Sequence, residues 1–174
     1  MTCQHCDFVK NREGLVYEDD TAAILLHKSP AMPGHLLVLP KEHFTIIEHT
    51  PDTVVRKLAA LSNKASASLL QVLGAGGTNI VIENGTGAQQ QIPHLAVNVI
   101  PRVEGDGINL QWQPKKLSEE QMSLIELQLK EQTKNIGVEP EKKEPIRLDD
   151  AEAKGGGEVV KKSDYLTKQL RRVP

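Results

Sequence analysis

The chain opens with short apolar runs separated by polar turns, which is the pattern of β-strands. The run at 35–39 is bracketed by Pro33–Gly34 and Pro40, which is typical of a buried strand. Apolar runs of strand length occur at 16–18, 22–26, 35–39, 79–83, 95–100 and 108–112. We therefore expect a sheet built from both halves of the chain.

Apolar residues recur at helical spacing between Thr50 and Gly74. Thr50 is the predicted N-cap, and Pro51 is expected in the first turn, where its missing N–H costs nothing. Gly74 is expected to end the helix. The apolar stripe consists of Val54, Leu58, Leu61, Ala65, Leu69 and Leu73. This spacing predicts one amphipathic helix against the sheet.

A second helix is predicted after residue 118. Ser118 and Gln121 have the spacing of a capping box at a helix start. Its predicted inner face consists of Met122, Ile125 and Leu129. Three strands, a helix, three strands and a helix favour an α+β fold, an antiparallel sheet with its helices on one side.

The composition changes after about residue 134. Between Glu131 and Asp164, 16 of 34 residues are charged, which indicates a linker rather than a packed segment. We expect a domain at 1–134, a charged glycine-containing linker at 135–164, and a C-terminal docking segment at 165–174. Apolar spacing at Leu166, Leu170 and Val173 suggests docking; the alternative is a solvated end.

Composition places the chain among ordinary globular proteins. Its 174 residues are 39% hydrophobic, enough for one core of sizeable volume. A formal net charge of -2 argues against coating nucleic acid by bulk electrostatics. No apolar window approaches the ~20 residues of a membrane span, and the first residues do not resemble a signal peptide. We expect a cytoplasmic protein with no membrane partner.

The two cysteines, Cys3 and Cys6, form a Cys-x-x-Cys pair. A disulfide framework would normally need more cysteines than these two. The same spacing is half of a tetrahedral zinc site, which histidines elsewhere in the chain could complete. The spacing alone does not decide between a zinc site and two free thiols.

Two further stretches, 30–43 and 94–102, carry a resemblance to a known family. The first reads Pro30-Ala-Met-Pro-Gly-His-Leu-Leu-Val-Leu-Pro-Lys-Glu-His43, and the second reads His94-Leu-Ala-Val-Asn-Val-Ile-Pro-Arg102. In order and spacing, residues 3–115 resemble the histidine triad (HIT) family of nucleotide hydrolases and transferases. The resemblance implies a five-stranded antiparallel sheet with two helices, commonly paired into a homodimer.

The triad itself is degenerate in this chain. The family pattern is three histidines alternating with apolar residues on one strand; the middle one attacks the α-phosphorus and the third bonds phosphate oxygens. The matching positions here are His94, Ala96 and Asn98. Alanine has no lone pair, and asparagine does not titrate. We therefore expect no catalytic residue at these positions.

A metal set, by contrast, is complete. In zinc-bearing relatives an N-terminal Cys-x-x-Cys, the histidine after Pro-Lys-x and the first triad histidine bind one Zn²⁺. The resemblance carries these roles to Cys3, Cys6, His43 and His94. We expect a closed structural zinc site; the alternative is two free thiols and two unrelated histidines.

The resemblance also suggests ligand contacts. The expected nucleotide-binding residues are His27, Asn84, Gln90 and Asn98. His27 stands where the family usually has a ribose-contacting Asp or Asn, and Gln89 replaces a phosphate-loop glycine. Asn84 and Gln90 can equally be loop polars satisfied by backbone or water, and His27 an unliganded strand end.

The remaining histidines are expected to have no direct ligand role. His35 is expected to bond backbone beside the site. His5 and His49 are expected on the surface.

These expectations lead to three functional hypotheses. The first is a zinc-binding HIT-like module that has lost nucleotidyl-histidine chemistry and binds a purine nucleotide or a partner. The alternative is a nucleotide hydrolase or nucleotidyltransferase that works without the usual histidine nucleophile. A third is that residues 165–174, with Arg171 and Arg172, are read by a protein or RNA partner.

Overall fold

The structure is a computed structural model that describes residues 3–136. The chain divides into two compact units between Trp112 and Gln113, and each unit is described by itself. From residue 137 onward, the predicted linker (135–164) and the predicted docking segment (165–174) lie outside the described residues. Their roles remain predictions.

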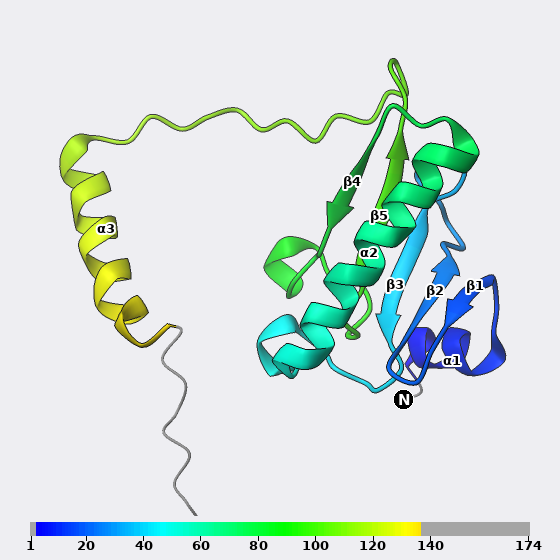
Figure 1. The fold of residues 1–174 in the computed structure, drawn as a ribbon. Coiled ribbons are helices and arrows are strands. Elements are labelled where there is room, and N and C mark those ends of the chain that lie inside the picture. Colours follow the sequence, from blue (N-terminus) through cyan, green and yellow to red (C-terminus); the bar gives the residue numbers. More distant parts are fainter. Residues whose placement is uncertain (1–2, 137–174) are drawn as a thin grey trace, which may run out of the picture. The chain divides into compact units, whose positions relative to one another are not determined.

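The first unit contains one antiparallel five-stranded sheet in the order β1-β2-β3-β5-β4 (Figure 1). Its strands are β1 Leu15–Glu18, β2 Ala22–Leu26, β3 Leu36–Pro40, β4 Gly77–Val81 and β5 Val97–Arg102. The predicted α+β class and the five-stranded sheet are confirmed. The predicted strand at 108–112 is wrong: this segment pairs with neither edge, and Trp112 is 85% exposed.

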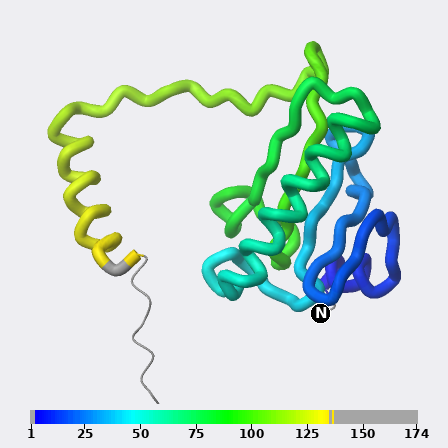
Figure 2. The backbone as a smooth tube through the Cα atoms, in the orientation of Figure 1, coloured from blue at the N-terminus to red at the C-terminus, as the bar shows by residue number. Residues whose placement is uncertain are grey.

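Helix α2, Asp52–Leu73, packs along one face of the sheet (Figures 1 and 2). Leu58, Leu61 and Leu69 on the predicted stripe are buried against the strands. On β5, Val97 and Val99 belong to this core, so the intervening Asn98 points to the opposite face. This alternation turns the degenerate triad positions away from α2.

The opposite face is partly covered by α1, Gln4–Asn11, a helix that was not expected from the sequence. Phe8 and Val9 of α1 pack against the second core cluster, which consists of Ala23, Leu25, Leu37 and Leu39. The helix brings the N-terminal cysteines to this face of the sheet. The predicted arrangement of helices on one side only is therefore wrong, because α1 and α2 lie on opposite faces.

The ends of α2 differ from the prediction at one terminus only. Pro51, rather than Thr50, is the N-cap, and no side chain caps the helix. The Thr50 hydroxyl instead donates to the carbonyl of Ile46 at 3.0 Å. At the other end Gly74 adopts a left-handed φ of 63°, as predicted for a glycine that terminates a helix.

The second unit contains α3, Glu119–Gln132, with the predicted Ser118–Gln121 capping box. Met122, Ile125 and Leu129 are exposed, so nothing within this unit, up to residue 136, covers the predicted inner face. Short 3₁₀ helices occur at Ile47–His49, Thr86–Ala88 and Thr133–Asn135. No helix within residues 3–136 is long and apolar enough to cross a membrane.

Candidate metal centre and ligand cavity

Three separate segments bring the four predicted metal ligands together. Cys3 and Cys6 come from the start of α1, His43 from the segment after β3, and His94 from the segment before β5. One donor atom from each residue lies within 4.8 Å of all the others. Residues 91 positions apart in sequence therefore meet at one point.

The distances match those around a tetrahedral metal ion. Cys3 Sγ and Cys6 Sγ each lie 3.4 Å from His94 Nδ1, and Cys6 Sγ lies 3.4 Å from His43 Nδ1. Metal–sulfur bonds of about 2.3 Å and metal–nitrogen bonds of about 2.0–2.1 Å at tetrahedral angles separate sulfur and nitrogen by about 3.5 Å. These four residues can hold a metal ion.

The orientation of His94 is fixed from its other ring nitrogen. His94 is 1% exposed, and its Nε2 lies 3.1 Å from the carbonyl oxygen of Pro40. A carbonyl only accepts, so Nε2 carries the proton and the lone pair of Nδ1 faces the two thiols. Burial lowers the pKa of His94, which favours the neutral, metal-binding form.

The Cys6 thiol is held protonated until a cation displaces its proton. Burial, reinforced by the neighbouring Cys3, raises the pKa of Cys6 to about 11. A metal ion would bind the thiolate form and release the proton. With two sulfur and two nitrogen donors the coordination shell is full, so the ion would crosslink α1 to the sheet and leave no position for a substrate.

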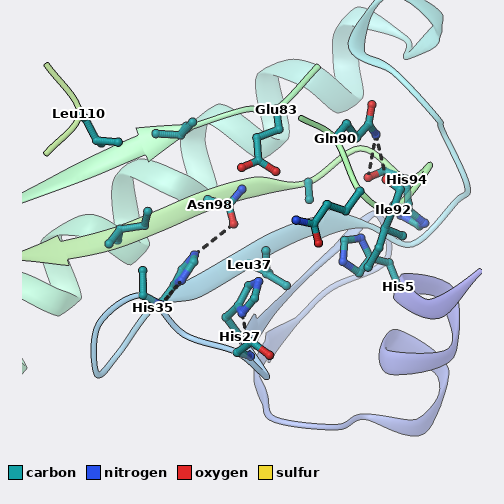
Figure 3. A pocket seen from close by; sticks show the side chains of 16 residues that line it. His5, His27, His35, Leu37, Glu83, Gln90, Ile92, His94, Asn98 and Leu110 are labelled. Carbon is teal, nitrogen blue, oxygen red and sulfur yellow. Dashed lines mark hydrogen bonds between the residues drawn. The ribbon is translucent and has the colours of Figure 1, made fainter. Parts of the chain in front are cut away.

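A cavity of about 410 Å³ opens beside this centre, on the sheet face opposite α2 (Figure 3). Three of the predicted nucleotide-binding residues line it: His27, Gln90 and Asn98. Asn84, the fourth, does not line it. Its lining consists of His5, His27, Ser29, Ala31, His35, Leu37, Val81, Glu83, Gln90, Gln91, Ile92, His94, Ala96, Asn98, Ile100 and Leu110.

His35 holds the Asn98 amide in one orientation (Figure 3). His35 Nδ1 accepts from the Ala31 N–H at 3.1 Å, so the ring proton lies on Nε2. Nε2 donates to Asn98 Oδ1 at 3.1 Å, which leaves the Asn98 NH₂ group as a donor at the cavity. Burial lowers the pKa of His35 and keeps the ring neutral. The structure confirms the predicted bond between His35 and backbone.

His27 stacks on His35 inside the cavity lining. The ring centroids are 4.4 Å apart and the planes differ by 11°. His27 Nδ1 accepts from the Ser29 N–H at 3.0 Å, so its Nε2 is a donor. The pair therefore presents one N–H group toward a ligand and no free lone pair.

The side chains of Asn84 and Gln90 stabilise the loop after β4 through hydrogen bonds. Asn84 Oδ1 accepts from the Ile47 N–H at 2.9 Å, and its amide donates to the Glu48 carboxylate. Gln90 donates to the carbonyls of Thr45 and Ile92, while its oxygen accepts from the Gly85 N–H at 2.8 Å. These contacts are structural, and ligand contact by either residue remains a prediction.

His5 and Glu83 are two titratable cavity residues for which no role at the site was predicted from the sequence. The prediction that His5 is exposed is wrong, because it is 7% exposed and lies edge-on to His94, with ring centroids 5.6 Å apart. Burial, followed by the proximity of His94, lowers the pKa of His5 to about 4. Glu83 follows β4 and directly precedes Asn84. This position in the sequence was the one signal that could have pointed to Glu83 as a cavity residue. His49 is exposed, as predicted.

Comparisons with known proteins decide the family. The family model described as "HIT domain" matches residues 9–105. The chain belongs to the HIT-domain family. Among curated relatives, it is 29% identical over 124 residues to adenylylsulfatase HINT3 of Arabidopsis thaliana, covering 70% of this chain and 61% of that relative. The chain thus spans less than two thirds of that protein.

Two solved HIT structures are similar to this one. A Zn-bound histidine triad family protein from Mycobacterium smegmatis has 30% identity and a TM-score of 0.60, over 76% of this chain and 96% of that one. A hypothetical histidine triad nucleotide-binding protein from Sulfolobus tokodaii has 30% identity and a TM-score of 0.57, over 78% and 97%. The metal cluster and the cavity therefore belong to a HIT fold.

Proposed function

We propose that this protein is a zinc-stabilised HIT module that binds nucleosides and nucleotides and has lost the covalent chemistry of its family. The main support is that Ala96 lines the cavity at the position where the family pattern has its attacking imidazole. The cavity is within the roughly 300–1,000 Å³ of small-molecule sites. Binding is therefore retained in this proposal, and nucleophilic catalysis is not.

Zinc is the proposed metal because of the donor set. Two thiolates and two imidazoles in a tetrahedral arrangement suit Zn²⁺ better than oxygen-seeking cations. The similarity to a Zn-bound HIT protein supports this choice. When bound, the ion would hold the start of α1 against His43 and His94, and so fix His5 beside the cavity.

His27 and His35 do not replace the missing nucleophile. Attack on phosphorus needs an unshared ring lone pair pointed at the ligand. Both ring nitrogens of His35 are hydrogen-bonded, and Nδ1 of His27 is bonded to Ser29. Neither ring offers such a lone pair toward the cavity, which supports a binding role.

The ligand class comes from the comparisons. One similar structure is described as a nucleotide-binding protein, and one relative is named an adenylylsulfatase. The cavity combines apolar walls, such as Leu37, Ile92 and Ile100, with the amide of Asn98. Such a mixture suits a flat base with a polar sugar.

The test is an adduct and turnover assay on the full-length chain. Purified protein is incubated with adenylylsulfate, adenosine and guanosine phosphoramidates, dinucleoside polyphosphates and nucleotide sugars, and analysed by mass spectrometry. The proposal predicts ligand binding, no phosphate-linked adduct and turnover at the level of buffer. The double variant Ala96→His/Asn98→His, which restores the triad residues, shows whether an adduct is detectable on this scaffold.

Turnover by the unmodified chain that falls when Asn98 is changed to alanine contradicts the loss of catalysis. In that case the alternative function, hydrolysis by direct attack of water, is the correct one. Absence of binding to every nucleoside and nucleotide tested contradicts the ligand-binding function.

The family resemblance also leads us to propose that the protein forms a homodimer in the cytoplasm. We further propose that residues 165–174 bind a protein or RNA partner. Sedimentation equilibrium of the full-length chain tests the homodimer, and a monomer at all concentrations rejects it. Deleting residues 165–174 tests the tail, and an unchanged set of co-purifying partners rejects a docking role.

A further inference from the structure

The charge of the cavity is unusual for a site that receives a phosphate. Among its described lining residues Glu83 is the single carboxylate, and there is no lysine or arginine. His35 is kept neutral by burial, so it supplies a dipole rather than a cation. The lining therefore places a negative charge, and no fixed positive charge, beside a bound ligand.

Four backbone donors of the loop after β4 are unavailable to offset this charge. Anion sites in proteins commonly present several free N–H groups from one loop. Here the Gly85 N–H donates to Gln90 Oε1, and the Ala88 and Gln90 N–H groups donate to the Gly85 carbonyl at 3.1 and 3.2 Å. The Gln89 N–H donates to Thr86 at 3.1 Å. These four donors are committed within the loop.

Three polar groups of the lining form a pattern of two donors and one acceptor. The Asn98 NH₂ and the His27 Nε2–H are donors, whereas the Glu83 carboxylate only accepts. Within residues 3–136, Glu83 makes no hydrogen bond or ion pair to another side chain. A ribose hydroxyl can donate to a carboxylate and accept from an amide at once, whereas an ionised phosphate only accepts and is repelled by the carboxylate.

We propose that this cavity selects an unphosphorylated nucleoside over its 5′-monophosphate, with Glu83 as the specificity-determining residue. The proposal rests on the function proposed above, since it names the preferred ligand of that cavity. Glu83 receives hydrogen bonds from the sugar, and Asn98, oriented by His35, donates to it. A phosphate in the same cavity meets the Glu83 charge without a compensating cation.

The test is calorimetric titration of the full-length, zinc-loaded chain with adenosine, guanosine and their 5′-monophosphates at low ionic strength. The measured quantity is the ratio of the nucleoside and monophosphate dissociation constants. In Glu83→Gln the affinity for the monophosphate, relative to that for the nucleoside, is expected to rise about fivefold. Glu104→Gln, which changes the net charge equally at an exposed residue outside the lining, is the matched control and is expected to leave the ratio unchanged.

The outcomes separate this inference from the proposed function. Tighter binding of nucleosides, together with a shift in Glu83→Gln alone, supports the inference. Tighter binding of monophosphates, or an unchanged ratio in Glu83→Gln, overturns the inference and leaves the binding function standing. Absence of binding by all four compounds up to millimolar concentration overturns both. A preference that weakens as salt is added further supports repulsion by Glu83.

Discussion

His35 Nε2 donates a 3.1 Å hydrogen bond to Asn98 Oδ1 and so links the segment before β3 to the start of β5. His35 is 6% exposed, and its other nitrogen is bonded to the backbone of Ala31. The bond orients the amide that stands at the third triad position. The third triad position is thus occupied by an ordered amide that His35 holds in place.

The His35–Asn98 pair is expected to stabilise the fold as a coupled unit. Asn98→Ala leaves a largely buried N–H without its acceptor, which costs about 1 kcal/mol in the free energy of unfolding. A double-mutant cycle with His35→Ala measures the coupling by chemical denaturation. We expect a coupling energy of about 1 kcal/mol; strictly additive effects would show that the bond contributes nothing.

Gly34 is expected to disfavour any side chain. Its φ is +88°, and a Cβ there would overlap Leu73 Cδ1 at the end of α2. Gly34→Ala should lower the free energy of unfolding by about 1 kcal/mol, chiefly because of backbone strain at positive φ, since the half-exposed Leu73 side chain can turn aside. Gly77→Ala is the control, since its Cβ would meet nothing within 4 Å. Equal stability of the two variants would contradict this packing.

Asp19 is expected to make stability depend on acid. The Lys57 ammonium at 2.8 Å, with donation from the N–H groups of Thr21 and Ala22, holds the pKa of Asp19 well below its usual range. Because the folded pKa is the lower one, the ionised carboxylate stabilises the fold above the unfolded value of 3.8. That contribution is lost as the pH falls below it toward the folded pKa.

Asp19→Asn should therefore reduce stability by about 1 kcal/mol near pH 7 and by progressively less below about pH 4. Thermal unfolding from pH 2 to 7 measures the difference. Asp20→Asn, at the exposed neighbouring position, is the control with the same change of charge. A constant difference across this pH range would show that Asp19 is not ionised differently in the folded state.

The metal ligands are expected to be distinguishable from other histidines. His43→Ala should remove the bound metal and lower the melting temperature by roughly 10 °C, because a crosslink worth several kcal/mol is lost. His49→Ala removes an exposed histidine outside the cluster and should do neither. Scanning calorimetry with and without a chelator makes the comparison. A chelator effect that is equal in His43→Ala and the unmodified chain would place the metal elsewhere.

Much of the fold could be predicted from local patterns, but contacts without a local pattern could not. The runs at 22–26 and 35–39 are apolar enough to specify buried strands, and observed β2 and β3 coincide with them to within one residue. Helix α1 is only eight residues long, too short for its apolar spacing to predict a helix from the sequence, and it is held by packing of Phe8 and Val9 on the sheet. Residues 108–112 alternate like a strand but have no partner, and alternation carries no information about partners.

The candidate site divides in the same way. The alternation of His94, Ala96 and Asn98 predicts that they share a face, and all three line one cavity. The four metal ligands were predicted from the family resemblance, through the spacing of the two cysteines and the two histidines. His5 and Glu83 reach the cavity through the placement of α1 and the end of β4, and neither residue belongs to a local motif.

The central claim is that a metal ion fastens the amino-terminal helix to the sheet. Elemental analysis of the freshly purified, untagged full-length chain tests it most directly, with Cys3→Ser/Cys6→Ser as the comparison. We predict one zinc ion per chain, absent from the double variant. A chain that carries no stoichiometric metal, while both thiols react freely with a thiol reagent, would contradict the account.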